Sequence, residues 1–178
     1  MALSATIFKI DLNIADMDRN YYADHRLVIA RHPSETDERM MVRVLAFACH
    51  ASDSLQFTRG LSSDEDEPDI WDKDLTGNIE TWIDVGQPDP KRVRKACGRA
   101  RRVFIYVYGR SADQWWQRSS AELARFENLT VINWNKVATD ALAKTADRNM
   151  QLQCTIQDGQ ILVSAADESL QISNDTWK

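Results

Sequence analysis

Residues 102–109, RVFIYVYG, form an almost continuous apolar run. A strand with one face in water alternates polar and apolar residues, whereas a strand covered on both faces does not need to alternate. The run is short and rich in β-branched and aromatic residues, which favours a strand over a helix. It therefore predicts a central strand with other layers packed on both faces, an arrangement typical of α/β proteins.

Two helices are predicted by capping residues that precede apolar stripes. Ser34 and Asp37 have the spacing of a capping box, and apolar residues at helical spacing then predict a helix over about 35–51. Asp89 can cap a second helix with Pro90 at its first position, where the missing N–H costs nothing. Two further helices are expected, one beginning near Ser111 and one over 135–144.

Strands are expected around these helices. The predicted core strands are SLQFT at 54–58, PDIW at 68–71, IETWIDV at 79–85 and LTVINW at 129–134. Both ends of the chain alternate polar and apolar residues, at 5–14, at 20–31 and around an Asp158-Gly159 turn, which is a strong hairpin signal. We expect one domain: a helix-and-strand core over 35–144, with accessory β-strands from 1–33 and 148–176 that pair into a second sheet.

Composition narrows the function classes. The 178 residues carry a net charge of −5, which argues against non-specific coating of DNA but allows a local basic groove. The start of the chain lacks a basic signal-peptide region, and no segment approaches the roughly 18 apolar residues of a membrane span. Three widely spaced cysteines read as free thiols. We therefore expect a cytoplasmic protein that does not bind membranes.

Opposite charges are segregated along the chain. Seven of the eleven residues in 64–74 are acidic, and seven of the twelve residues in 91–102 are basic with no acid among them. A solvated acidic loop and a solvated helix face explain such runs in most proteins. The more specific interpretation depends on which carboxylates lie on strands.

Two of these carboxylates lie on predicted strands. Asp69 opens the strand PDIW, and Asp84 lies near the end of IETWIDV. In the PD-(D/E)XK class of nucleases, two strand-borne carboxylates hold a divalent cation that polarises the scissile phosphate and activates water. Mg²⁺ prefers oxygen ligands, so the backbone carbonyl of Val85 is a natural third ligand, with Mn²⁺ as a possible substitute metal. The predicted order of helix, three strands, helix and strand also matches the restriction-endonuclease-like mixed-sheet core of that class.

The lysine of that class is missing. Residue 86 would face the same side as Asp84, but it is Gly86. Lys91 and Lys95 lie one turn apart on the following helix, and either could reach the attacking water. Spacing does not choose between them.

Other residues could complete such a site. Arg92 and Arg94 on the predicted basic helix, and Arg39 and Arg43 on the first helix, are phosphate-binding candidates, with an ion pair to the acidic loop as the alternative for the latter two. Glu38 could join the metal ligands, although a glutamate in a first turn more often complements the helix dipole.

Several separated segments carry a resemblance to one family. These are RHPSETDERMMVR, LQFTRGL, PDIW, WIDVGQPD, KRVRKAC and MQLQCTIQDG, in this order. Together they span most of the chain and resemble the YaeQ family of bacterial proteins. The resemblance implies a fold similar to that of PD-(D/E)XK nucleases and leaves the activity open.

Two functional hypotheses follow. The first is a Mg²⁺-dependent nuclease or nucleic-acid-processing enzyme, with Asp69 and Asp84 as metal ligands and Lys95 or Lys91 near the attacking water. The second is a non-catalytic protein, either nucleic-acid-binding or transcription-associated and regulatory, that keeps a nuclease-like scaffold; Gly86 and the acidic net charge favour it. The sequence decides neither between DNA and RNA nor the oligomeric state.

Overall fold

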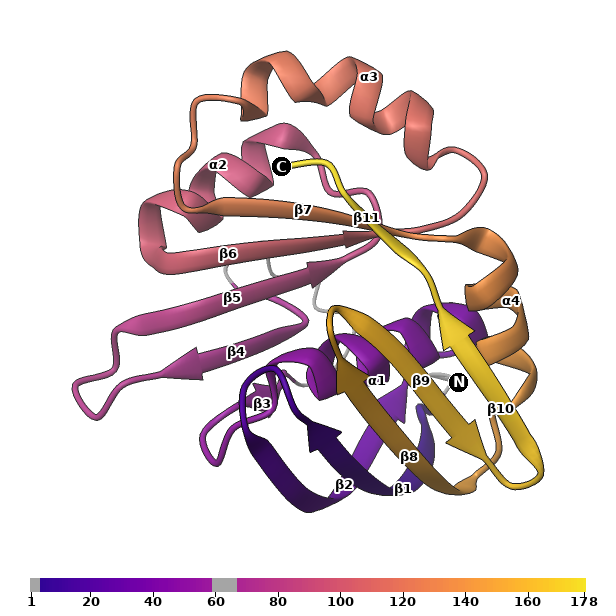
Figure 1. Cartoon of the computed structure of the whole chain (residues 1–178). Helices are drawn as coiled ribbons and strands as arrows, with labels where there is room; N and C mark the ends of the chain where they lie inside the picture. The colour runs from indigo at the N-terminus through magenta and orange to yellow at the C-terminus, as the bar shows by residue number, and fades with distance from the viewer. Residues whose placement is uncertain (1–3, 59–66) are drawn as a thin grey trace. The chain divides into compact units, whose positions relative to one another are not determined.

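The computed structural model describes residues 4–58 and 67–178, and it is a mixed α/β structure with two mixed sheets (Figure 1). Four helices lie within these residues. The chain divides into two compact units. The first unit comprises residues 1–49 and 137–173, and the second unit comprises 50–136 and 174–178.

The first unit is a five-stranded sheet in the order β10-β9-β8-β1-β2. Its strands are β1 (Thr6–Asp16), β2 (Tyr21–Arg31), β8 (Asn149–Gln157), β9 (Gln160–Ala165) and β10 (Glu168–Ile172). All neighbours are antiparallel except β1 and β8, which are parallel. Apolar residues of α1 (Asp37–His50) and α4 (Lys136–Lys144) enclose a small apolar space with β1, β8 and β9, so both helices pack on one face of this sheet.

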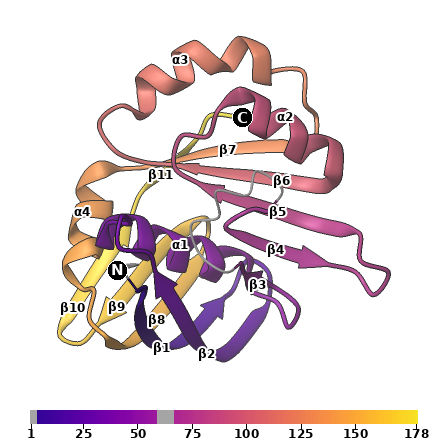
Figure 2. The ribbon, with the colours of Figure 1, turned by 180° about the vertical axis from the view of Figure 1, so that it is seen from behind.

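The second unit is a six-stranded sheet in the order β11-β7-β6-β5-β4-β3. Its strands are β3 (Gln56–Phe57), β4 (Ile70–Lys73), β5 (Ile79–Val85), β6 (Ala100–Val107), β7 (Leu129–Trp134) and β11 (Asn174–Thr176). β5, β6 and β7 run parallel, and α2 (Pro90–Arg99) and α3 (Ala112–Leu123) cover one face of the sheet (Figure 2). Trp82, Val93, Val103, Ile105 and Trp115 belong to the apolar core beneath these helices.

Two of the local details that differ from the expectations concern the start of α1 and the pairing of β11. The first helix begins at Asp37 and is capped by Thr36, whose Oγ1 accepts the Arg39 N–H at 3.1 Å. The capping box predicted from Ser34 is therefore wrong, because the Ser34 N–H instead pairs with the His32 Nδ1. The strand β11 pairs with β7 in the second unit, although we expected every strand of 148–176 in the accessory sheet.

Other expectations agree with the structure. Asp89 Oδ1 accepts the Lys91 N–H at 2.8 Å and caps α2. Asp158 and Gly159 form the β8–β9 turn with positive φ values of 51° and 73°, as a two-residue hairpin of this type requires. None of the helices described is long and apolar enough to cross a membrane.

Candidate functional site

Asp84 lies at the carboxyl end of β5, between β4 and β6 in the second unit. Its residue exposure is 2%, so its carboxylate is removed from water and requires partners inside the protein. The chain leaves β5 one residue later and returns through Asp89 into α2. Side chains of the first turn of α2 are thereby brought to the end of β5.

Arg92 on α2 is the cation that contacts Asp84. Its Nε donates to Asp84 Oδ2 and its Nη2 to Asp84 Oδ1, both at 2.9 Å, which makes a bidentate pair. The same Nη2 donates to the Glu67 carbonyl at 2.7 Å, and the guanidinium lies 5.9 Å from the centre of the Trp82 ring. Trp82 Nε1 donates to Asp84 Oδ2 at 3.0 Å. Both oxygens of Asp84 therefore accept hydrogen bonds from within the second unit.

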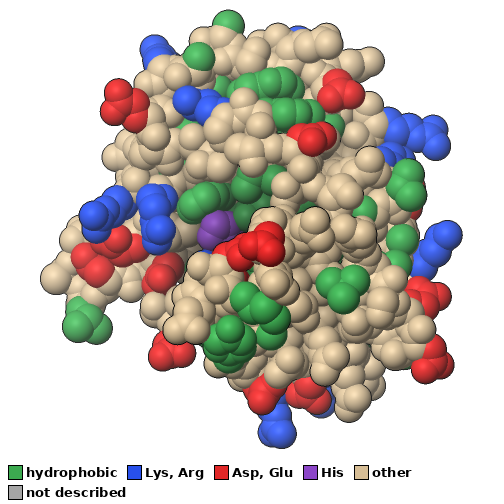
Figure 3. Space-filling model, viewed as in Figure 1, with side chains coloured by type: hydrophobic (Ala, Val, Ile, Leu, Met, Phe, Trp, Pro, Cys, Tyr) green, Lys and Arg blue, Asp and Glu red, His purple; other side chains and the backbone are tan. Residues whose placement is uncertain are grey.

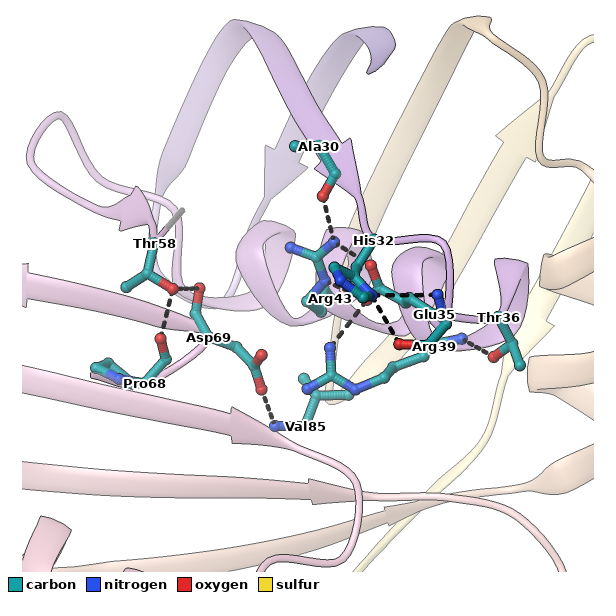
Figure 4. A network of polar contacts seen from close by, with 11 residues as sticks. Ala30, His32, Glu35, Thr36, Arg39, Arg43, Thr58, Pro68, Asp69 and Val85 are labelled. Atoms are coloured by element: carbon teal, nitrogen blue, oxygen red, sulfur yellow. Dashed lines mark hydrogen bonds and ion pairs between the residues drawn. The ribbon is translucent and has the colours of Figure 1, made fainter. Parts of the chain in front are cut away.

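Asp69 immediately precedes β4 and has a different set of partners (Figure 4). Ile70 pairs with Ile83 across the β4–β5 ladder, and one residue further along the backbones are Asp69 and Asp84. The Asp69 Oδ2 accepts the Val85 N–H at 2.8 Å, so this carboxylate takes the place of a ladder acceptor. Asp69 is 7% exposed, and it is a second buried acid at the end of β5.

The environment of Asp84 disfavours its charge. Burial is the largest cause and raises the pKa of Asp84 above the ordinary aspartate value, the bonds from Arg92 and Trp82 lower it, and the nearby negative charge of Asp69 raises it further. The net direction is upward. The site thus holds more negative charge than its surroundings favour, and the guanidinium of Arg92 offsets part of this excess.

The two lysines considered as substitutes for the missing one, Lys91 and Lys95, are exposed on α2, as is Arg94. Gly86 has φ +109°, and a Cβ built on it would meet no atom within 4 Å. Residue 86 is therefore not a strand position from which a lysine could project beside Asp84, because its backbone takes a conformation that other L-residues rarely adopt. The backbone conformation, and not crowding, disfavours a side chain there.

The arginines of the first helix lie in the first unit (Figure 4). Arg43 is 2% exposed and forms a bidentate pair with Glu35, its Nε and Nη2 both 2.8 Å from the carboxylate oxygens, and its Nη2 also donates to the Ala30 carbonyl. Arg39 Nη1 donates to Glu35 Oε1 at 2.9 Å. The burial of Arg43 does not favour a phosphate contact, and Glu35 is a carboxylate partner of this arginine within the first unit.

Glu38 accepts a hydrogen bond from Thr139 Oγ1 at 2.7 Å within the first unit. Arg59, a weaker phosphate-binding candidate before Gly60, lies outside the described residues. In the portion of the chain that the structure describes, no group of three His, Cys, Asp or Glu side chains is placed to hold one metal ion.

Sequence reasoning assigned Arg92 to phosphate binding and missed its pairing with Asp84. The available signal was weak, because four basic residues occupy the first two turns of α2 and spacing alone did not show which one faces β5. Trp82 was also missed as a donor. Its position two residues before Asp84, on the same face of a strand, was the signal for this contact.

Comparisons with known proteins agree with this fold over the whole chain. The family model described as YaeQ protein matches residues 1–174. The Salmonella typhi YaeQ protein is 47% identical and the Escherichia coli K12 protein 44% identical, each over 100% of this chain and 98% of the relative. The crystal structure of YaeQ from Xanthomonas axonopodis pv. citri superposes with a TM-score of 0.94 at 47% identity, covering 98% of this chain and 99% of that one. The Pseudomonas syringae YaeQ structure gives 0.93 at 33% identity, covering 98% and 96%.

Proposed function

We propose that this chain, which belongs to the YaeQ family, binds nucleic acid through the phosphate backbone without hydrolysing it. In this proposal it keeps a restriction-endonuclease-like scaffold and acts in the cytoplasm. The observation that carries the proposal is the bidentate pair of Arg92 and Asp84. In this proposal the Arg92 guanidinium takes the place of the cation that a nuclease with such a scaffold would hold beside Asp84.

The donor set at the end of β5 does not fit a resident Mg²⁺ ion. Mg²⁺ requires near-octahedral oxygen ligands, usually with one or two carboxylates free to bind it. Both Asp84 oxygens accept hydrogen bonds from Arg92, and Asp69 Oδ2 accepts one from Val85. The described residues also offer no third acidic or histidine ligand. An arginine remains charged at any physiological pH and does not activate water as a tunable lysine can.

The surface beside this pair suits phosphate contacts. Lys91, Arg94 and Lys95 are exposed on α2, which carries no acidic side chain. In Figure 3, basic and acidic side chains are both scattered over the face in view. Binding is therefore expected to depend on the local α2 surface and to be weak and salt-dependent, without base specificity.

The test is fluorescence anisotropy with labelled single- and double-stranded DNA and RNA oligonucleotides over a range of salt. The triple variant Lys91→Glu, Arg94→Glu, Lys95→Glu is expected to lose affinity at least tenfold. For duplex DNA, the slope of the logarithm of the binding constant against the logarithm of the salt concentration should become shallower by roughly 0.9 for each phosphate that the variant no longer neutralises. A matched control, Lys9→Glu, Lys144→Glu, Arg148→Glu, makes the same charge change at exposed positions of the first unit.

The control is expected to retain most of the affinity. Equal losses in both triple variants would show that only total charge matters, and absence of binding by the wild-type protein would refute the proposal. No cleavage of any of these oligonucleotides is expected with Mg²⁺ or Mn²⁺.

A second candidate, a Mg²⁺-dependent nuclease, is favoured by one observation. Asp69 and Asp84 are two buried acids whose mutual repulsion contributes to the raised pKa of Asp84. A metal site would require Arg92 to leave Asp84. Mn²⁺ titration by calorimetry therefore distinguishes the two: wild-type binding, abolished by Asp84→Asn and accompanied by oligonucleotide cleavage, would establish the nuclease. Binding only after Arg92→Ala would instead show that Arg92 occupies the cation position.

A further inference from the structure

The strand β2 is a long edge of the first unit's sheet. Among the described residues the sheet ends at β2, which has eleven residues, contains no proline and pairs with β1 in one uninterrupted register. The opposite edge, β10, has only five residues. Proteins generally shorten or interrupt edge strands, because an unbroken edge can pair with another chain.

The side chains of β2 that point away from α1 are exposed. Tyr22 is 60% exposed and Val28 is 67% exposed, which is high for an aromatic and a branched apolar residue. Between them lie Asp24 and Arg26, and the Arg26 side chain is 95% exposed. An apolar residue, an acid, a base and a second apolar residue therefore follow one another on this face.

The pairing of β1 with β8 and with β2 determines which residues of β2 direct their backbone N–H and C=O groups away from the sheet. The Lys9 N–H donates to Arg148 next to β8, so alternate residues of β1, beginning with Ile10, direct their backbone groups toward β2. Ile10 pairs with Leu27, so the odd-numbered residues of β2 bond to β1. The even-numbered residues, which include Asp24 and Arg26, then direct their N–H and C=O groups outward from the sheet.

We propose that two copies of this chain pair through β2 in an antiparallel, two-fold symmetric ladder centred on His25. In this register Asp24 is opposite Arg26 of the second copy, and Tyr22 is opposite its Val28. All four are residues with outward backbone groups, so each facing pair can exchange two hydrogen bonds. The occupant of this edge is a second copy of the chain, and this inference does not depend on the proposed function.

The charges on β2 favour this register over symmetric pairings centred one residue away. A symmetric pairing centred on Arg26 sets two arginines opposite each other, and one centred on Asp24 sets two aspartates opposite each other. Facing like charges are destabilising, whereas facing opposite charges and aromatic–branched pairs stabilise an antiparallel ladder. Only the centre at His25 gives opposite charges and apolar contacts in the same pairing.

Symmetric disulfide formation tests the register. His25 would face itself as a non-hydrogen-bonded pair with Cα atoms about 4.5 Å apart, within disulfide range. In a chain with Cys49, Cys97 and Cys154 replaced by alanine, His25→Cys should form a covalent dimer under mild oxidation. Ala23→Cys on the same strand should not. Equal cross-linking of both variants, or of neither, would overturn the register.

Charge exchange tests the interface itself by sedimentation equilibrium. Asp24→Arg and Arg26→Asp should each weaken self-association at least tenfold, and the double variant should restore it because the facing charges are again opposite. Gln153→Glu, at an exposed position on β8, is the control and should leave the association unchanged. A wild-type protein that stays monomeric at high concentration, or a double variant no stronger than either single one, would refute the proposed dimer.

Discussion

The Arg92 guanidinium and the Asp84 carboxylate form a bidentate pair in which both N···O distances are 2.9 Å. The Asp84 side chain is 3% exposed and the Arg92 side chain 22%, so the pair is shielded from water mainly on the aspartate side. The pair places a cation against a buried carboxylate at the end of β5 and occupies both oxygens of Asp84.

Removing only the arginine should be costly. Arg92→Met leaves Asp84 charged and buried without its cation, and we expect the free energy of unfolding to fall by about 3 kcal/mol. The double variant Arg92→Met, Asp84→Asn removes the charge while an amide oxygen can still accept the Trp82 Nε1–H. It should be more stable than the single variant by about 1–2 kcal/mol in urea denaturation. A double variant no more stable than Arg92→Met would contradict this account.

The cost of Arg92→Met should depend on pH. Without Arg92, burial and Asp69 hold the folded-state pKa of Asp84 above its unfolded value with less opposition. Below the unfolded pKa the carboxyl is protonated in both states, and stability is lost as pH rises through the folded pKa. The difference in the free energy of unfolding between wild type and Arg92→Met should therefore shrink as the pH falls from 7 to 4. The Arg92→Met, Asp84→Asn variant is the control. The difference between its free energy of unfolding and that of wild type should not shrink as the pH falls, because residue 84 no longer titrates.

A side chain at residue 86 should be destabilising. Gly86 has φ +109°, and both Gly86→Ala and Gly86→Lys are expected to lower the free energy of unfolding by about 1–3 kcal/mol. A Cβ there meets no atom within 4 Å, so the two variants should behave alike. Gly98→Ala in α2, where φ is not positive, should instead raise stability by up to about 1 kcal/mol. A thermal shift assay orders the three variants, and a stable Gly86→Lys protein would rule out backbone strain.

The arginines of α1 should differ in their effect on stability. Arg43→Met leaves the fully buried Glu35 side chain without its bidentate partner, and a loss of about 3–5 kcal/mol is expected. Arg39→Met removes the bond from Arg39 Nη1 to Glu35 Oε1, made by a side chain that is 19% exposed, while Arg43 still neutralises Glu35, so the loss of this bond should contribute about 1 kcal/mol. Equal losses by chemical denaturation would show that the Arg43 pair has no special role.

Several elements could be predicted because their local signals were unambiguous. The strands 79–85 and 129–134 have the predicted bounds, and the cap of α2 is Asp89 as expected. Ser34 failed as a cap because two possible capping residues, Ser34 and Thr36, precede the same apolar stripe. The destination of β11 could not be predicted, because its three residues are polar and its pairing depends on a partner forty residues away in the chain.

The candidate site was predicted in part for a similar reason. Two acids at neighbouring strand ends were visible in the sequence, whereas the roles of Arg92, Lys91 and Lys95 depended on the rotation of α2 about its axis. That rotation is set by the burial of Val93 and Ala96 against the sheet, which directs Arg92 toward β5. The tertiary packing of α2, which spacing does not report, therefore decides which cation meets Asp84.

The parallel pairing of β1 with β8 has a consequence for the order of folding. It joins residue 9 to residue 149, so β1 and β2 cannot complete their sheet until most of the chain has been synthesised. Contacts of such long sequence separation form slowly, because the loop-closure entropy is lost before they can stabilise the chain. The strands β3 to β7 occupy one uninterrupted segment and can pair earlier, during translation. In the nascent protein the β1 edge of the β1–β2 hairpin should then stay unpaired the longest, because its partner β8 is synthesised late.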